Sequence, residues 1–582
     1  MPKEVKQFIF TFLDPFIKPT ARLVDKEWCS LIIKTAFIFR ALQKSEYEAK
    51  IQQLSRLSDR IAIRFPFSRL LDQETIENGL TKLKNLVSLD ISLLHNLEIS
   101  LSEHRTDLDR LEYLSIYRPL PNVIASLTKI RQLVIQYDYL RNRTFKISTT
   151  IEDLAFESVI TQTIDPEALF NLTEYHSQLT TLRCEGVVFS NPTNVFASLT
   201  QLKNLRNLRL RPRYGPENYP MSLLGLDLVS LDLANIDVSI EDITTLTRLT
   251  KLALSGVDLI FRNLTKLTNL KTLEIMPAHK ETFWTALTGL EDVANYATKD
   301  GSFVNLLTSE HLTRLFVSMS RGGYEPSTIE SSINRLSNLK TLGLSFKSNF
   351  NFQRGIMLPN LSNLSMTISS PGIDLRGAPN LTKLTLCLNQ PLQKLDLGLP
   401  TKLEHFFLSS SVNRTKKPVQ EQIFPNLANL TSLKALAICW PSDIIHENLP
   451  RSTQLEYLHI ELDGILEEEF LQRLTNLTTL KIRTEEKESG KDVFLPIVSN
   501  MTRLQELVIP IYSDALVLGL TKLGNLTQLK AQKFSARIQF GSVTQLTSLR
   551  YLELGIESDL SSYDLRDELF AHLPFLEEWQ CQ

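Results

Sequence analysis

Residues 264–275 read LTKLTNLKTLEI, and close copies of this stretch recur along the chain. They include LTKLKNLVSLDI at 80–91, LTQLKNLRNLRL at 199–210, LANLTSLKALAI at 427–438 and LQRLTNLTTLKI at 471–482. All of them fit the skeleton LxxLxxLxxLxL. Self-similarity at a fixed period is the sequence signature of a repeat architecture, so we expect a solenoid rather than a string of unrelated domains.

The second-last apolar position of each copy serves as an anchor for counting the repeats. With one degenerate copy at Val293, the chain carries about 21 units at a mean spacing of about 23 residues. The other anchors are Leu89, Leu114, Leu133, Leu154, Leu182, Leu208, Leu231, Leu252, Leu273, Leu315, Leu342, Leu364, Leu384, Phe406, Leu436, Leu458, Leu480, Leu507, Leu529 and Leu552.

The two ends of the skeleton predict different structures. The LxL end alternates with period two, as a short strand with one buried face does, and the LxxLxxL beginning has period three, which suits a helical or 3-10 turn. One unit cannot bury both elements alone, whereas stacked units cover one another. We therefore expect an α/β solenoid with a curved parallel sheet on its concave face and helical or 3-10 turns on its convex face.

This skeleton resembles that of the leucine-rich-repeat family, which implies the same solenoid and a long inner surface able to hold another macromolecule. The chain departs from the family at two points. Repeat lengths vary, and the extra residues of the longer repeats are expected to form loops that could carry specificity. The position after the strand that commonly holds an Asn or Cys is not systematically filled, and this predicts less regular stacking.

The first forty residues have a different pattern. In PKEVKQFIFTFLDP, apolar residues fall at helical intervals, and Asp14-Pro15 ends the helix. In ARLVDKEWCSLI, Leu23 or Val24, Trp28 and Leu31 or Ile32 form the apolar side of a second helix. Two or three short helices cannot close a stable core, so we expect part of this apolar surface to meet a partner.

Residues 1–42 resemble an F-box. The resemblance is carried by Pro2 and Val5, by Phe12-Leu13-Asp14-Pro15, and by Arg22-Leu23-Val24, Lys26 and Trp28, in register and without gaps. Met1 replaces the usual Leu before the Pro, and Lys18-Pro19 stand where the family usually has leucines. The resemblance implies a SKP-type adaptor as partner, contacted by Pro2, Val5, Phe8, Ile9, Phe12, Leu13, Leu23, Val24 and Trp28.

An F-box joined to leucine-rich repeats is the layout of substrate receptors in cullin-based ubiquitin ligases. The resemblance thus implies a non-catalytic subunit that holds a protein substrate on its repeats for ubiquitination. The alternative is a protein-binding scaffold, or a pathogen or symbiont effector, with no ligase role. The predicted organisation is an F-box-like segment at 1–42, a connecting helical region or cap at 43–79, repeats at 80–560 and a C-terminal cap at 561–582.

Charge and cysteine content restrict the partners and the compartment. Lys+Arg 63 against Asp+Glu 65 leaves a net charge of -2, which disfavours nucleic acid and anionic membrane as partners. The five cysteines form no CxxC pair, and we find no signal peptide and no apolar run long enough to span a membrane. We expect a cytoplasmic protein, with the nucleus or a host cytosol as alternatives.

Catalytic motifs are missing from the sequence. There is no GxSxG, no HExxH, no glycine-rich phosphate loop and no His, Cys and carboxylate cluster at metal-ligand spacing. We therefore predict no enzyme activity, no metal and no cofactor.

Candidate binding residues lie between or just after the paired leucines of the strands, where the inner face is expected. One set is aromatic, and rings that recur on one face are candidate anchors for a partner. These are Tyr117, Tyr137, Phe316, Phe346, Phe407 and Trp440.

The other set is Arg183, Arg209 and Arg211, which neighbouring strands should bring together. It could bind an acidic or phosphorylated determinant or a small anion such as an inositol phosphate. We favour the alternative, a solvated face balanced by Glu185 and Asp232, because surface charge runs are usually solvent contacts.

Overall fold

The computed structural model describes the repeats and many of their connecting turns. The described residues are 35–38, 44–56, 61–64, 73–80, 82–91, 110–116, 127–137, 150–158, 163–164, 178–189, 199–212, 219–256, 264–276, 289–298, 309–319, 326–346, 355–368, 372–388, 396–410, 427–440, 449–462, 468–484, 498, 500–511, 514–534, 543–556, 573, 576 and 578–581.

The chain forms two compact units, Met1–Leu249 and Thr250–Gln582, and each contains a long run of parallel strands. In the first unit the strands follow one another across the sheet in chain order. They are β1 (Thr35–Ile38), β2 (Ile61–Arg64), β3 (Leu86–Ile91), β4 (Tyr113–Ile116), β5 (Gln132–Tyr137), β6 (Asp153–Ser158), β8 (Thr181–Glu185), β10 (Asn207–Arg211) and β12 (Ser230–Ala234).

The second unit repeats this arrangement over more strands. They are β14 (Lys251–Ser255), β15 (Thr272–Met276), β16 (Asp292–Thr298), β17 (Arg314–Met319), β18 (Thr341–Phe346), β19 (Asn363–Ile368), β21 (Lys383–Leu388), β23 (His405–Ser410), β24 (Ala435–Trp440), β25 (Tyr457–Leu462), β26 (Thr479–Thr484), β27 (Glu506–Ile511), β28 (Gln528–Phe534), β29 (Tyr551–Ile556) and β30 (Glu578–Cys581).

Short parallel pairs lie beside the main sheets. In the first unit, β7 (Thr163–Ile164) pairs with β9 (Val188–Phe189), and β11 (Tyr219–Met221) pairs with β13 (Ile236–Val238). In the second unit, β20 (Gly372–Ile373) pairs with β22 (Asp396–Leu397).

The anchors counted in the sequence are the residues that align the strands. Within each unit every anchor is the register partner of the next, as Leu182 is of Leu208 and Leu342 is of Leu364. All of them, including Val293 and Phe406, are no more than 2% exposed. The predicted leucine-rich-repeat solenoid is thereby confirmed.

The first half of the skeleton forms the predicted period-three turns. The amide of Leu267 donates to the carbonyl of Leu264 at 2.9 Å, and that of Leu270 donates to Leu267 at 3.0 Å, which is the 3-10 pattern. The same pair of bonds joins Leu520, Leu523 and Leu526. These leucines face the core, so the LxxLxxL turn can complete the repeat without additional residues.

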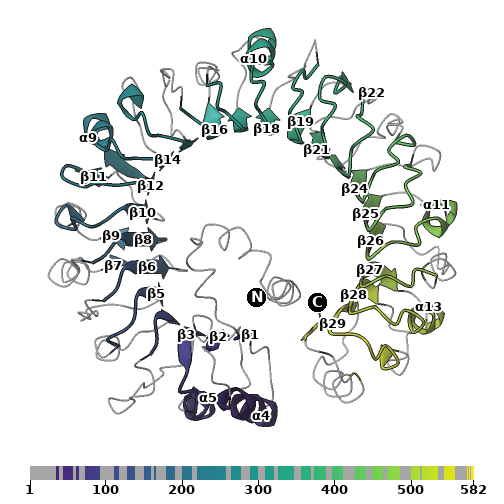
Figure 1. Ribbon diagram of the computed structural model, residues 1–582. Helices are drawn as coiled ribbons and strands as arrows, with labels where there is room; N and C mark the ends of the chain where they lie inside the picture. Colours follow the sequence, from purple (N-terminus) through teal and green to yellow (C-terminus); the bar gives the residue numbers. More distant parts are fainter. Residues whose placement is uncertain are drawn as a thin grey trace. The chain divides into compact units, whose positions relative to one another are not determined.

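Helices lie on the opposite side of each sheet from the inner face. They are α4 (Lys44–Ser55), α5 (Gln73–Leu80) and α9 (Ile240–Thr245) in the first unit, and α10 (Pro326–Ile333), α11 (Glu468–Gln472) and α13 (Asp514–Leu520) in the second, where the 3-10 turn η2 (Leu264–Lys266) also lies. Within each unit, Figure 1 shows the strands along the inner side of the curve and these helices along its outer side.

Asparagine side chains in several turns tie a repeat to the one before it. Asn338, Asn360, Asn476 and Asn525 each donate from Nδ2 to a backbone carbonyl of the preceding repeat, at 2.7 to 2.9 Å. These asparagines stand before the strand, whereas the family position considered in the sequence stands after it. The repeats therefore have an asparagine link, at a different place in the skeleton.

The parallel sheet begins before residue 80, where the sequence analysis placed the first repeat. Phe37 on β1 pairs with Ile63 on β2, and Ile63 pairs with the anchor Leu89. These two strands lack the LxxLxxL turn that makes the later repeats visible in the sequence. Residues 1–34, which hold the predicted adaptor contacts, lie outside the described part. Within the described residues, no helix combines the length and apolar character needed to cross a membrane.

Candidate functional site: the inner face of the sheets

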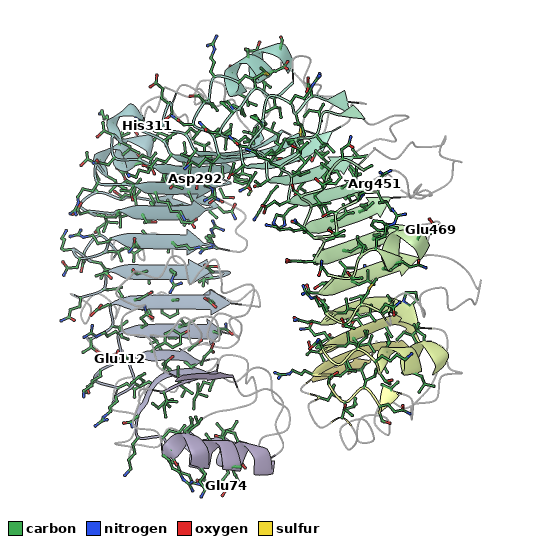
Figure 2. The ribbon with its side chains drawn as sticks, turned by 45° about the vertical axis from the view of Figure 1, so that its right-hand side comes forward. Glu74, Glu112, Asp292, His311, Arg451 and Glu469 are labelled. Atoms are coloured by element: carbon green, nitrogen blue, oxygen red, sulfur yellow. The ribbon has the colours of Figure 1, made fainter. Side chains whose placement is uncertain are left out.

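Three residues of each strand face away from the core. On β10, Leu208 and Leu210 are 1% exposed, whereas Asn207, Arg209 and Arg211 are partly exposed on the opposite face. We call these the first, second and third inner positions; they lie one residue before the anchor, one after it and three after it. Because the anchors are in register, each position forms a row that runs across the strands. Figure 2 shows side chains projecting from both faces of the sheets.

In the first unit the inner positions of β6 to β12 carry a ladder of charges, which we call the arginine ladder. It consists of Asp153 on β6, Arg183 and Glu185 on β8, Arg209 and Arg211 on β10, and Asp232 on β12. The register places Arg209 between Arg183 and Asp232, so like and opposite charges meet on neighbouring strands.

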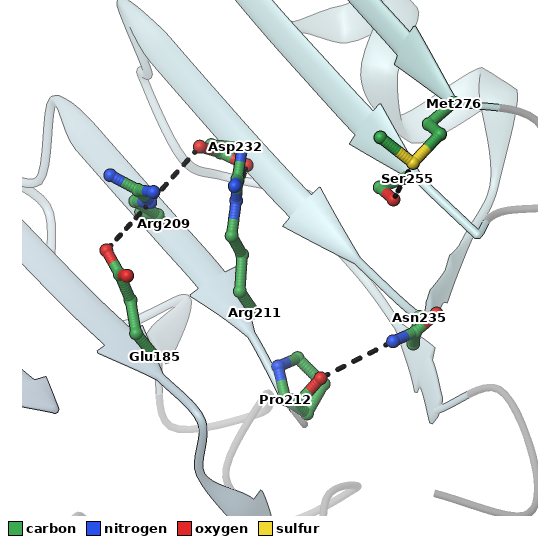
Figure 3. A network of polar contacts seen from close by, with 8 residues as sticks. All are labelled: Glu185, Arg209, Arg211, Pro212, Asp232, Asn235, Ser255 and Met276. Carbon is green, nitrogen blue, oxygen red and sulfur yellow. Dashed lines mark hydrogen bonds and ion pairs between the residues drawn. The ribbon is translucent and has the colours of Figure 1, made fainter. Parts of the chain in front are cut away.

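Every arginine of this ladder lies beside a carboxylate. Nη2 of Arg183 is 3.1 Å from Oδ2 of Asp153. Nε of Arg209 is 3.0 Å from Glu185 and 3.3 Å from Asp232, as ion-pair contacts rather than aligned hydrogen bonds. Figure 3 shows the Arg209 guanidinium between these two carboxylates.

Asp232 is the centre of the ladder. Its side chain is 11% exposed, and it also accepts a hydrogen bond of 2.8 Å from Nε of Arg211. Burial raises the pKa of Asp153 at the other end, and the Arg183 guanidinium opposes that rise. The arginines are thus already compensated from within the sheet, which favours the charge-balanced interpretation over an anion site.

The second unit has an inner surface of the opposite character. Six successive strands, β17, β18, β19, β21, β23 and β24, carry no charged residue at their second and third inner positions. We call this surface the uncharged strip. Its second row is Phe316, Gly343, Ser365, Thr385, Phe407 and Ala437. Its third row is Ser318, Ser345, Thr367, Cys387, Ser409 and Cys439.

Two phenylalanine rings stand in the second row of the strip. A Cβ added at Gly343 would overlap the ring of Phe316, so that ring leans over the neighbouring strand where glycine leaves room for it. The Arg314 guanidinium lies 5.9 Å from the ring centroid, within cation–π range. Phe407 is 37% exposed, which is high for so large an apolar side chain on a sheet.

The third row of the strip is made of small polar groups that contact one another across strands. Ser409 Oγ lies 3.1 Å from Cys387 Sγ, and Thr367 Oγ1 lies 3.5 Å from Ser345 Oγ. The first inner row beside the strip is more basic, with Arg314, Lys383 and His405, and Arg314 is paired with Asp292 at 3.1 Å. Asp292 is labelled in Figure 2.

Beyond the strip, β25 to β29 carry charged pairs again. Lys481 Nζ is 2.7 Å from Glu506, Lys530 Nζ is 2.7 Å from Glu553, and Arg483 is 3.9 Å from Glu461. Lys530 also lies over the ring of Tyr551 at 5.0 Å. Burial would raise the pKa of Glu553, but the hydrogen bonds from Lys530 and Tyr551 together with the positive charges of Lys530 and Arg483 lower it.

His459 on β25 makes this end of the inner face sensitive to pH. Burial lowers its pKa, Glu461 and Glu506 oppose that shift, and Arg483 and Lys481 add to it. The unfolded chain therefore binds a proton at His459 more readily than the folded one. We expect stability to be lost as the pH falls below the ordinary histidine pKa of about 6.5 and through the lower folded-state pKa. At higher pH this contribution is constant.

Thermal unfolding of the wild type and of His459→Gln between about pH 7.5 and pH 5 measures this dependence. The wild type should lose more of its unfolding temperature on acidification than the variant. His405→Gln serves as a second variant, because burial and Lys383 also lower the pKa of His405. Identical pH profiles for all three proteins would contradict the assignment.

The structure brings together only part of the set of binding residues predicted from the sequence. Arg183, Arg209 and Arg211 lie on adjacent strands of the first unit, and Phe316 and Phe407 lie in one row of the second. Tyr137, Phe346 and Trp440 lie on strands, but their side chains are outside the described part, as is Tyr117 altogether. These four positions stay predictions.

Sequence reasoning missed two features of the inner face. It did not identify Asp153 as the partner of Arg183, and it did not single out the small residues between Phe316 and Phe407. Reading the residues before and after each anchor in successive repeats, as two columns, would have shown both. Among the described residues, no group of three or more His, Cys, Asp or Glu side chains could hold a metal ion.

Comparisons with known proteins identify no family beyond the repeat. No family model matches the chain, and no curated protein matches it. A structure of a TLR13–ssRNA13 complex aligns at 15% identity with a TM-score of 0.42, covering 90% of this chain and 80% of that one.

Two further solved structures are leucine-rich-repeat proteins. One, from Leptospira interrogans, aligns at 16% identity and a TM-score of 0.33 over 83% of this chain and 98% of its own. The other, CroV588, described as circular, aligns at 13% identity and a TM-score of 0.37 over 91% and 84%.

Proposed function

We propose that this chain is a non-catalytic substrate-recognition subunit. Its inner face holds a protein, and its N-terminal segment binds a SKP-type adaptor of a cullin-based ubiquitin ligase. The observation that supports this is the order of two features: residues 1–42 carry the F-box pattern in register, and a repeat sheet with an exposed inner face follows them.

The inner face supports a binding role more than a catalytic one. Its titratable side chains are spread along the sheets as ion pairs, such as Arg211 with Asp232 and Lys481 with Glu506. No nucleophile is required of this chain in the proposed role. A bound protein's lysines gain effective concentration at the ligase, and catalysis comes from the ligase's other subunits.

Co-purification with a SKP-type adaptor tests the ligase part of the proposal. The full chain should co-elute with the adaptor, and Leu13→Ala and Trp28→Ala should each weaken the complex at least about tenfold, because truncated apolar anchors are the costliest interface changes. The control is Leu518→Ala, which removes a 43% exposed apolar side chain on α13 and should leave adaptor affinity unchanged.

Failure of the wild-type chain to co-elute with the adaptor would contradict the ligase role. If the inner face still bound a protein in that case, the chain would be a plain protein-binding scaffold. Circular dichroism of both variants should show the repeat region intact, so that loss of the complex reports the contact itself.

A further inference from the structure

The uncharged strip differs in charge from the inner faces of β6 to β12 in the first unit and of β25 to β29 in the second. On those strands, cations and carboxylates alternate at short distance, as Arg209 with Asp232 and Lys530 with Glu553 do. On the strip, the second and third inner positions of six strands hold no charge, whereas Arg314, Lys383 and His405 lie in the first row beside them. A charged group of a partner that was buried over Ser365, whose own strand carries Asn363 in the first row, would lose its hydration without gaining a counter-ion.

The shape of the strip suits a polypeptide main chain. Between Phe316 and Phe407 the second row holds only Gly343, Ser365 and Thr385, so nothing large stands between the two rings. The hydroxyls of Ser365 and Thr385 can both donate and accept, as a main chain requires. The absence of bulk lets that main chain approach the sheet closely.

The distance between the two rings sets a spacing for the partner. Phe316 and Phe407 are four strands apart, which at about 4.8 Å per strand is roughly 19 Å. An extended chain advances about 3.3 Å per residue, so that span corresponds to about six residues. Side chains six apart on an extended chain point to the same side, so both can face the sheet.

We propose that the uncharged strip binds an extended, uncharged segment of a partner protein. The segment carries two apolar side chains about six residues apart that contact Phe316 and Phe407, with small polar residues between them. This deepens the proposed function and rests on its premise that the inner face holds a protein. It does not depend on the adaptor.

Selection from a random dodecapeptide library on the full chain, without adaptor, supplies the probe. We expect the enriched peptides to lack charge in their central part and to carry apolar residues about six apart. A synthetic, fluorescein-labelled copy of one such peptide is then titrated against the wild type, Ser365→Glu and Ser365→Lys by fluorescence anisotropy. Both variants should bind at least about tenfold more weakly, because the other inner positions of the same strand, Asn363 and Thr367, offer no counter-ion to either sign of charge.

The controls are Thr431→Glu and Thr431→Lys, which place the same charges in the exposed turn before β24 and should change the affinity less than about twofold. Thr385→Lys repeats the test at a second position of the strip, where the new cation would lie beside Lys383. Enrichment of charged peptides, enrichment of none, weakening by only one sign of charge, or unchanged binding by the Thr385 and Ser365 variants would overturn the proposal. Each of these results leaves the adaptor measurement unaffected, so the two proposals can fail separately.

Discussion

Replacing Phe406 by alanine should lower the free energy of unfolding by about 3–5 kcal/mol, the usual cost of truncating a buried phenylalanine. Phe406 takes the anchor position of its repeat, where most repeats have leucine, and it is 1% exposed. It pairs in register with Leu384 on β21 and Leu436 on β24. The cavity left by the ring would therefore open between two neighbouring repeats.

Phe407→Ala is the matched control for this change. It removes the same ring from the next residue of the same strand, but Phe407 is 37% exposed on the inner face. Its loss should cost less than about 1 kcal/mol of stability. Denaturant unfolding followed by circular dichroism compares the two variants. Equal losses of unfolding free energy would mean that Phe406 and Phe407 are assigned to the wrong faces of β23.

Asp232→Ala should have the second largest effect, a loss of about 2–3 kcal/mol of stability. Its carboxylate is 11% exposed and compensates both Arg209, at 3.3 Å, and Arg211, at 2.8 Å. Removing it leaves two guanidinium groups close together on β10, where Arg209 retains the carboxylate of Glu185 at 3.0 Å.

Asp227→Ala is the corresponding control in the same unit. Asp227 also lies between two arginines, at 2.9 Å from Arg206 and 2.7 Å from Arg248, but its side chain is 44% exposed. Exposed pairs contribute little, so its removal should cost less than about 1 kcal/mol. If the two aspartate variants unfolded at the same denaturant concentration, burial would not determine how much Asp232 contributes to stability in the arginine ladder.

The period of the leucines was sufficient to predict the fold. Each anchor from Leu89 to Leu552 is on a strand and in the core, because an LxL pair has one arrangement that buries both leucines in a stacked repeat. The strands β1 and β2 were not predicted, since Ile61 and Ile63 stand without the LxxLxxL turn that defines the repeat.

The site was less predictable because it depends on register across strands rather than on sequence neighbours. Arg183 and Asp153 are thirty residues apart, and only the alignment of β6 with β8 brings them into contact. The uncharged strip is likewise a row of residues from separate repeats. Single residues such as Phe407 could be placed on the inner face from the LxL pattern, but the chemistry shared by their neighbours could not be inferred from one repeat alone.

Site-specific photo-cross-linking tests most directly whether the inner face is the binding surface. The photo-reactive residue benzoylphenylalanine replaces Ser365 on the uncharged strip in one protein and Thr431 in the turn before β24 in another, and each full-length protein is irradiated with the selected peptide. We predict a covalent product from position 365 and none from position 431. A product from position 431 alone would place the partner away from the inner face and contradict the account.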